Sequence, residues 1–159
     1  MEVVILPSAT EVGVLAARKI MHLVGRKPDA VLGLATGSSP LAIYAALAAH
    51  VREGTLDAGQ VSGFALDEYV CIGVEHPESY AAVIQREVTG PLHLDPERVH
   101  VPDGRAVDLE AAAERYEELI RAAGGVDLQI LGIGANGHVG FNEPTSSFAS
   151  RTRIKTLTR

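Results

Sequence analysis

Short apolar runs alternate with amphipathic stretches along this chain, and this alternation constrains the fold more than any other feature. The clearest apolar runs are 30–35, 64–66 and 126–133, and each is followed by a turn of glycine or polar residues. Between these runs, apolar residues recur at helical spacing, as in 12–23 and 109–123. The order predicts a three-layer α/β fold, in which a mainly parallel sheet carries helices on both faces.

The turn chemistry gives approximate bounds for each element. Ser8 and Glu11 form an S-x-x-E capping box, and Ser39 with Pro40 has the composition of an N-cap followed by the first helical residue. We expect strands at 3–7, 30–35, 64–66, 99–101, 126–133 and 151–157. We expect helices from Ser8 to Gly25, from Ser39 to about Glu53, from Pro77 to about Val88, and from Asp108 to Gly124.

Bulk composition limits the function classes. The 159 residues, of which 47% are apolar, are enough for a single α/β domain over 1–159 with a real core. A net charge of −6 argues against a nucleic-acid partner. Cys71 is the only cysteine, so an internal disulfide and a cysteine zinc site are excluded, which fits a reducing cytoplasm. The N-terminus lacks the features of a signal peptide, and no apolar run approaches the roughly 20 residues of a membrane span.

Polar side chains follow three of the predicted strands. In open α/β sheets, ligands bind outside the carboxyl ends of the strands. Thr36–Ser39 follow the first of these strands, Asp67 follows the next, and His138 with Glu143 follows the last. We therefore expect one cleft that combines a phosphate cradle with acid–base groups, and proton-transfer chemistry on a small phosphorylated metabolite.

The predicted phosphate cradle consists of Thr36, Gly37, Ser38 and Ser39. A turn from a strand into a helix directs free N–H groups and the positive end of the helix dipole at one point, which suits a phosphate. The turn is not a Walker A loop, because no lysine follows the glycine. An ordinary capped strand–helix turn is the alternative.

The acid–base candidates each have a structural alternative. Adjacent carboxylates point opposite ways, so only one of Asp67 and Glu68 should face the cleft, where burial could tune it as a carbon base. The alternative is a solvated or helix-capping acid. His138, with Asn136 and Glu143, could shuttle protons near neutral pH, or could simply bond a nearby carbonyl. A metal site from Asp67, His138 and Glu143 lacks the short paired spacing of known motifs, so no metal is expected.

The glycines of the 131–144 segment also match a dinucleotide-binding pattern. Gly132, Gly134 and Gly137 satisfy G-x-G-x-x-G, which requires a following helix and an acidic residue about 20 positions on. The segment 138–148 has no helical stripe and contains Pro144, and no carboxylate follows at that spacing. We interpret these glycines as a tight turn beside a ligand.

Four motifs, in this order and at these spacings, resemble glucosamine-6-phosphate deaminase over nearly the whole chain. They are LGLATGSSP, LDEY with EHPESY, GANGHVGFNEP and SSFASRTRIKTLT. Related sugar-phosphate lactonases share the fold and the glycine-rich turn, but not the last two motifs in full. The resemblance implies a hydrolase of amino sugar catabolism in the cytoplasm. Such an enzyme converts glucosamine 6-phosphate and water to fructose 6-phosphate and ammonia without an organic cofactor.

The resemblance also implies roles for single residues. Asp67 matches the base that moves a proton between C2 and C1, His138 matches the group that handles the ring-oxygen proton, and Glu143 matches its supporting carboxylate. Asn136 matches a position that is Asp or Asn in the family; with Asn, the relay is less acidic and His138 depends more on Glu143. The phosphate loop matches Thr36, Gly37, Ser38 and Ser39.

Regulation and length are further expectations from the resemblance. Ser146, Arg153 and Lys155 match residues that bind the activator N-acetylglucosamine 6-phosphate at subunit contacts in hexameric members, which suggests a homo-oligomer. Family members continue well past Arg159, so we expect 1–159 to be the N-terminal part of a deaminase domain, and the isolated chain to associate and lack activity.

Two other functions stay open at the level of sequence. A 6-phosphogluconolactonase-like hydrolase would act on a lactone and would not need Asp67 as a carbon base. A non-catalytic sugar-phosphate-binding domain, such as the sensor of a transcription regulator, needs a DNA-binding segment, and the sequence contains none.

Overall fold

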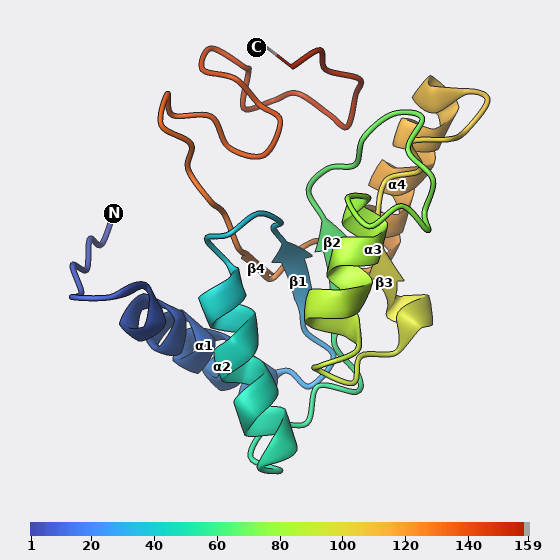
Figure 1. Ribbon diagram of the computed structural model, residues 1–159. Helices are drawn as coiled ribbons and strands as arrows, with labels where there is room; N and C mark the ends of the chain where they lie inside the picture. The colour runs from blue at the N-terminus through green and yellow to red at the C-terminus, as the bar shows by residue number, and fades with distance from the viewer. Residues whose placement is uncertain (158–159) are drawn as a thin grey trace.

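A parallel sheet forms the centre of the molecule in the computed structural model, which describes residues 1–157. The strands lie in the order β3-β2-β1-β4, and every neighbouring pair is parallel. Figure 1 shows the sheet between the helices, with the carboxyl-terminal part of the chain running above it. The strands are β1 (Val31–Leu34), β2 (Ser62–Ala65), β3 (Val99–His100) and β4 (Leu128–Gln129).

Helices cover both faces of this sheet, as the alternation of the sequence predicts. The α-helices are α1 (Ala9–Arg26), α2 (Leu41–Arg52), α3 (Tyr80–Ile84) and α4 (Leu109–Ala122), and the short helices are η1 (Gln85–Thr89), a π-helical continuation of α3, and η2 (Pro96–Arg98). In Figure 1, α1 and α2 lie side by side. None of the helices in residues 1–157 is long and apolar enough to cross a membrane.

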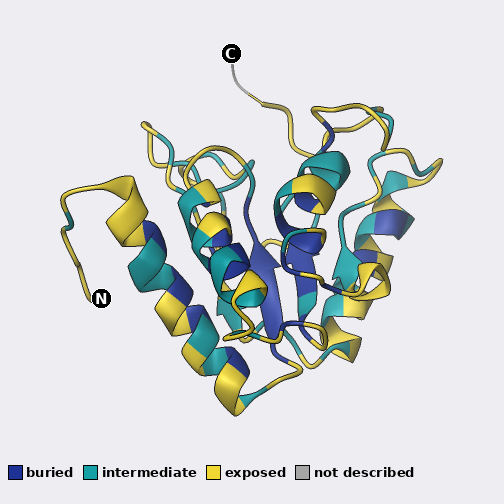
Figure 2. Ribbon diagram, turned by 60° about the horizontal axis from the view of Figure 1, so that its bottom comes forward, coloured by how far each residue is buried: buried dark blue, intermediate teal, exposed yellow. Residues whose placement is uncertain are grey.

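Side chains of the central strands alternate between two apolar clusters. Leu32 and Leu34 of β1 belong to a large cluster with residues of α1, α2, α3 and η1. Val31 and Phe64 point to the other face, where they pack with Tyr116 of α4. Figure 2 shows the resulting buried strands between helices whose outer sides are exposed. The three-layer α/β prediction is confirmed.

Two predicted strands are wrong. Residues 3–7 are irregular, with Val3 71% and Ile5 91% exposed, and residues 151–157 are irregular as well. Neither an apolar run, as in 3–7, nor alternation, as in 151–157, makes a strand alone, because the backbone N–H and C=O groups of a strand need a neighbouring strand. Neither segment joins the sheet described for residues 1–157. The predicted strand 126–133 is present, but only over Leu128–Gln129.

Helix starts mostly follow the predicted capping chemistry. The Ser8 hydroxyl accepts from the Glu11 N–H at 3.2 Å, and the Asp108 carboxylate accepts from the Ala111 N–H at 2.9 Å. The prediction for α2 is wrong by one residue. Pro40 is the N-cap and no side chain caps this helix, so Ser39 lies in the preceding turn. The helix predicted from Pro77 begins after Ser79, which caps α3.

Candidate active site at the carboxyl end of the sheet

The predicted turns do gather at one edge of the sheet. Because β1, β2 and β4 are parallel, their carboxyl ends point the same way. Thr36–Ser39 follow β1, Asp67 follows β2, and the glycine-rich turn follows β4. A Cβ built on Gly132 would lie 3.8 Å from the Ser39 Cβ, so the glycine-rich turn runs beside the predicted phosphate loop.

The predicted phosphate loop has a geometry that requires glycine. Gly37 has a φ of +84°, in the left-handed region that side-chain-bearing residues rarely adopt. A Cβ at this position would meet no atom within 4 Å, so the constraint is the backbone conformation. Gly37, Ser38 and Ser39 are exposed just before α2 begins, where their N–H and O–H groups are open to a ligand.

A hollow of about 660 Å³ lies beside Asp67. Its walls are the segment after β2, residues 102–104, one side of α4 and the segment 137–157. Asp67 and Glu143 line it, whereas His138 and Asn136 do not, and neither does the predicted phosphate loop. The structure therefore brings part of the predicted constellation into one hollow and places the rest at the same edge of the sheet.

Burial makes Asp67 an unusual carboxyl. Burial raises its pKa to about 6; the Phe141 backbone N–H, which bonds the carboxylate, opposes the rise, and the nearby negative charge of Glu68 adds to it. A Cβ on Gly140 would come within 3.0 Å of the Asp67 Oδ2, so a glycine there lets the loop approach the carboxylate. A carboxyl with this pKa can gain and lose a proton near neutral pH.

Glu68 has a different environment from its neighbour. Its Oε1 accepts from the backbone N–H groups of Tyr69 at 2.8 Å and Tyr80 at 3.0 Å. Its Oε2 accepts from the Ser79 hydroxyl and the Ala81 N–H, both at 2.9 Å. Glu68 therefore secures the start of α3. Both Asp67 and Glu68 line the hollow, so the prediction that only one of them faces the cleft is wrong.

A chain of hydrogen bonds orders His138. The Asn136 Nδ2 donates to Glu143 Oε2 at 2.8 Å, which fixes the orientation of the amide. The Asn136 Oδ1 then accepts from the His138 backbone N–H at 3.0 Å and meets His138 Nδ1 at 2.8 Å. Because a carbonyl oxygen only accepts, the proton of the neutral ring sits on Nδ1, and Nε2 is left as the basic nitrogen.

Glu143 is thus linked to His138 through Asn136 by these hydrogen bonds. The imidazole packs over Gly134, where any Cβ would overlap the ring. Among residues 1–157, no group of three or more His, Cys, Asp or Glu side chains is placed to hold a metal ion.

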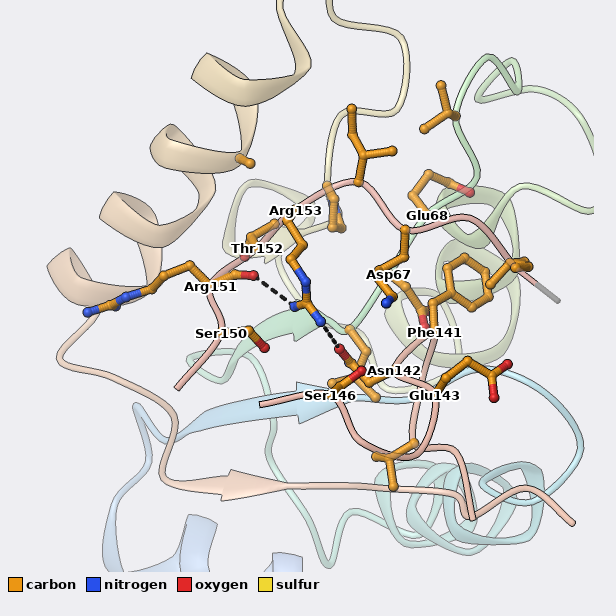
Figure 3. A pocket seen from close by; sticks show the side chains of 18 of the residues that line it. Asp67, Glu68, Phe141, Asn142, Glu143, Ser146, Ser150, Arg151, Thr152 and Arg153 are labelled. Carbon is orange, nitrogen blue, oxygen red and sulfur yellow. Dashed lines mark hydrogen bonds between the residues drawn. The ribbon is translucent and has the colours of Figure 1, made fainter. Parts of the chain in front are cut away.

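The segment 151–155 closes the hollow from the other side. Arg153 donates to Asn142 Oδ1 at 3.0 Å and to the Arg151 carbonyl at 3.1 Å, as Figure 3 shows. Glu117 of α4 holds this segment by accepting from Arg151 at 3.1 Å and from Thr152 N–H and hydroxyl at 2.8 Å. Ser146, Arg153 and Lys155, the predicted activator-binding residues, all line the hollow.

Three aromatic rings near Asp67 are not among the predicted site residues. The Tyr80 ring centroid lies 5.0 Å from that of Tyr69 and 5.6 Å from that of Phe141, and the last two are 5.1 Å apart. The only sequence signal was the proximity of EHPESY to LDEY.

Known proteins resemble this chain over nearly its whole length. Residues 8–147 match the family described as glucosamine-6-phosphate isomerases/6-phosphogluconolactonase. Glucosamine-6-phosphate deaminases of Arthrobacter sp. (strain FB24) and Pseudarthrobacter chlorophenolicus are 59% and 60% identical over 157 residues, which is 99% of this chain and 60% of each relative.

Solved structures give the same picture. A monomeric glucosamine-6-phosphate deaminase matches with a TM-score of 0.93 and 40% identity, over 99% of this chain and 66% of that one. A 6-phosphogluconolactonase from Thermotoga maritima matches with a TM-score of 0.70 and 28% identity, over 86% of this chain and 61% of that one. The chain spans about 60% of the length of the curated relatives. It belongs to the glucosamine-6-phosphate isomerase/6-phosphogluconolactonase family.

Proposed function

We propose that this chain carries the acid–base groups of a glucosamine-6-phosphate deaminase. The observation that carries the proposal is the half-buried Asp67 at the carboxyl end of β2, with a pKa raised to about 6. The identity of 59% with a curated deaminase supports the same choice, since the identity with the lactonase from Thermotoga maritima is lower, at 28%.

The first step we propose is ring opening. The unprotonated Nε2 of His138 would take the proton of the C1 hydroxyl and return it to the ring oxygen, which leaves a free aldehyde at C1. Glu143, through Asn136, keeps the imidazole in the tautomer that this step needs. The N–H and hydroxyl groups of Gly37–Ser39 would hold the phosphate.

The second step moves a proton along the open chain. The aldehyde acidifies the C2 hydrogen, so Asp67 can remove this proton while the aldehyde oxygen gains one, which gives an enolamine. Asp67 then delivers its proton to C1 and the amine loses one proton, which leaves a hydroxyl at C1 and an imine at C2. Water then adds at C2, and the C–N bond breaks with release of ammonia. One water is consumed for each ammonia, so the overall reaction is formally hydrolytic.

The remaining expectations are proposals from the resemblance. They are a cytoplasmic location, activation by N-acetylglucosamine 6-phosphate through Ser146, Arg153 and Lys155, assembly into homo-oligomers, and 1–159 as part of one catalytic domain. The segment Arg151–Arg153 supplies cations beside the hollow, which is consistent with an anionic ligand there.

The proposal is tested by offering the complete gene product glucosamine 6-phosphate and measuring ammonia and fructose 6-phosphate. We expect both products in equal amounts, and no hydrolysis of 6-phosphogluconolactone. Hydrolysis of the lactone without ammonia release from the amino sugar would instead support the lactonase alternative.

A further inference from the structure

Glu68 makes a set of hydrogen bonds that have no part in the proposed reaction. Its carboxylate is bound by four donors, and three of these belong to the start of α3: the Ser79 hydroxyl and the N–H groups of Tyr80 and Ala81. The fourth is the N–H of Tyr69. Ser79 is completely buried and the three bonds to α3 are partly buried, whereas the bond from Tyr69 is exposed to water. Glu68 therefore ties the segment that carries Asp67 to the first turn of α3.

Tyr80 is the residue through which this tie reaches the site. It is the first residue of α3, and its ring packs against the rings of Tyr69 and Phe141. The backbone of Phe141 in turn bonds the Asp67 carboxylate. The Tyr80 hydroxyl lies 3.3 Å from that of Tyr69, and the Thr36 side chain partly offsets the rise that burial causes in the Tyr80 pKa. Tyr80 thus interacts both with Asp67 and with Thr36 of the predicted phosphate loop.

We propose that Glu68 is a positioning residue, which holds Tyr80 against Asp67 and thereby fixes the proposed base relative to the phosphate loop. This inference rests on the proposed function for its kinetic consequences. Its structural content, that the start of α3 shields Asp67 from water only while Glu68 holds it, can be measured without any turnover.

The groups around Asp67 determine how its pKa should change when Tyr80 moves away. Glu68, Tyr80 of α3 and Tyr116 of α4 all interact electrostatically with Asp67. The hollow adds ionisable groups at its wall, namely Asp103, Glu117, Glu143, Arg151, Arg153 and Lys155. If the ring of Tyr80 withdraws, water reaches the carboxyl and its pKa falls from about 6 towards its ordinary value.

Four variants of the complete gene product separate the effect of the Glu68 charge on the Asp67 pKa from the effect of hydration. Glu68→Gln puts an amide N–H₂ among N–H donors and should release α3, but it also removes a charge beside Asp67. Tyr80→Ala keeps that charge and removes the ring, so a fall of the Asp67 pKa in this variant is caused by hydration. Tyr80→Phe keeps the ring. Asp108→Asn is the matched control, since this carboxylate caps α4 at the Ala111 N–H.

We expect Glu68→Gln and Tyr80→Ala each to lower kcat by about tenfold or more while KM changes by less than about threefold, because misplacement by a fraction of an ångström affects chemistry more than binding. The double variant should be no slower than the slower single variant, since both act through one contact. Carbon-13 NMR titration should show a lowered Asp67 pKa in both, and an unchanged one in Tyr80→Phe and Asp108→Asn.

The inference is overturned if Tyr80→Ala leaves the Asp67 titration unchanged, or if the effects of the two substitutions on kcat multiply. Loss of turnover in Glu68→Gln alone would make Glu68 a direct participant instead. If Glu68→Gln does not fold, the titration of Asp67 in Tyr80→Ala still tests the inference. If the wild type releases no ammonia, the proposed function fails, and the NMR titration alone then decides whether Glu68 and Tyr80 shield Asp67.

Discussion

Asp67 illustrates at the scale of one residue how position gives a common side chain a special chemistry. The sequence places two carboxylates side by side, and the structure gives them opposite environments. Glu68 receives four hydrogen bonds, whereas burial raises the pKa of Asp67 to about 6. The charged form of a carboxyl buried like Asp67 lowers the stability of the fold, and carboxyls with such a raised pKa are found mainly at functional sites.

The first prediction concerns turnover. In the complete gene product, Asp67→Asn should lower kcat by at least about a hundredfold, because the amide cannot take a proton from carbon. KM should change much less. In the wild type, kcat/KM should rise with pH through about 6, as the carboxyl ionises. Steady-state kinetics from pH 5 to pH 8 check both, and a variant with wild-type turnover would remove Asp67 from the mechanism.

The second prediction concerns stability. A raised pKa means that the folded state binds the proton more tightly than the unfolded chain, so wild-type stability falls as pH rises from about 4 to about 6. Asp67→Asn should remove this fall and stabilise the protein at pH 7 by about 1–2 kcal/mol, less than the full shift implies because the carboxyl is partly solvated. Urea unfolding at pH 4 and pH 7 measures the difference, which should vanish at the lower pH.

The third prediction concerns the phosphate loop. Gly37→Val forces a β-branched residue into a φ of +84° and should rebuild the turn. KM for glucosamine 6-phosphate should rise, with a stability cost of about 1–3 kcal/mol. Unphosphorylated glucosamine serves as the control, since a wild type that uses it equally well has no phosphate site in this loop.

At the scale of elements, α1 and α2 pack so closely that one position has no room for a side chain. A Cβ on Gly13 would lie 2.5 Å from the Ala42 carbonyl carbon, which belongs to a backbone that cannot move aside alone. Gly25 of the same helix has nothing within 4 Å. The pair offers a matched test of the helix contact.

The fourth prediction compares these two glycines. Gly13→Ala should destabilise the fold by about 1–3 kcal/mol, because the helices must separate. Gly25→Ala should stabilise it by up to about 1 kcal/mol through helix propensity. Denaturant unfolding of both variants checks the difference, and equal effects would show that the α1–α2 contact is looser than described.

The sequence predicts elements well where local chemistry decides them. Ser8 and Asp108 start helices as expected, because each cap acts within its own turn. The sequence predicts an element poorly where its formation depends on a segment far away in the chain. The alternating residues 151–157 form no strand, since strand formation depends on a neighbouring backbone.

The same division applies to the candidate site. Asp67 and Gly37 could be found from their places after apolar runs, whereas Tyr80 owes its position to Glu68 and to the approach of Phe141. Such contacts join segments that sequence spacing does not relate.

At the scale of the whole molecule, parallel strands bring three distant turns to one edge. The loop after β1, the carboxyl after β2 and the imidazole after β4 meet there although up to about a hundred residues separate them. The hollow beside them is walled by α4 and by the segment that Glu117 holds. The proposed deaminase needs this placement, since its phosphate binding and proton transfer would act on one small molecule.

The central claim is that Asp67 moves a proton between C2 and C1 of an amino sugar phosphate. The most direct test follows glucosamine 6-phosphate by proton NMR in D₂O with the complete gene product and its Asp67→Asn variant. We predict that the wild type converts the sugar with loss of the C2 hydrogen and release of ammonia, and that the variant leaves the C2 hydrogen in place. Undiminished loss of the C2 hydrogen in Asp67→Asn would contradict the claim.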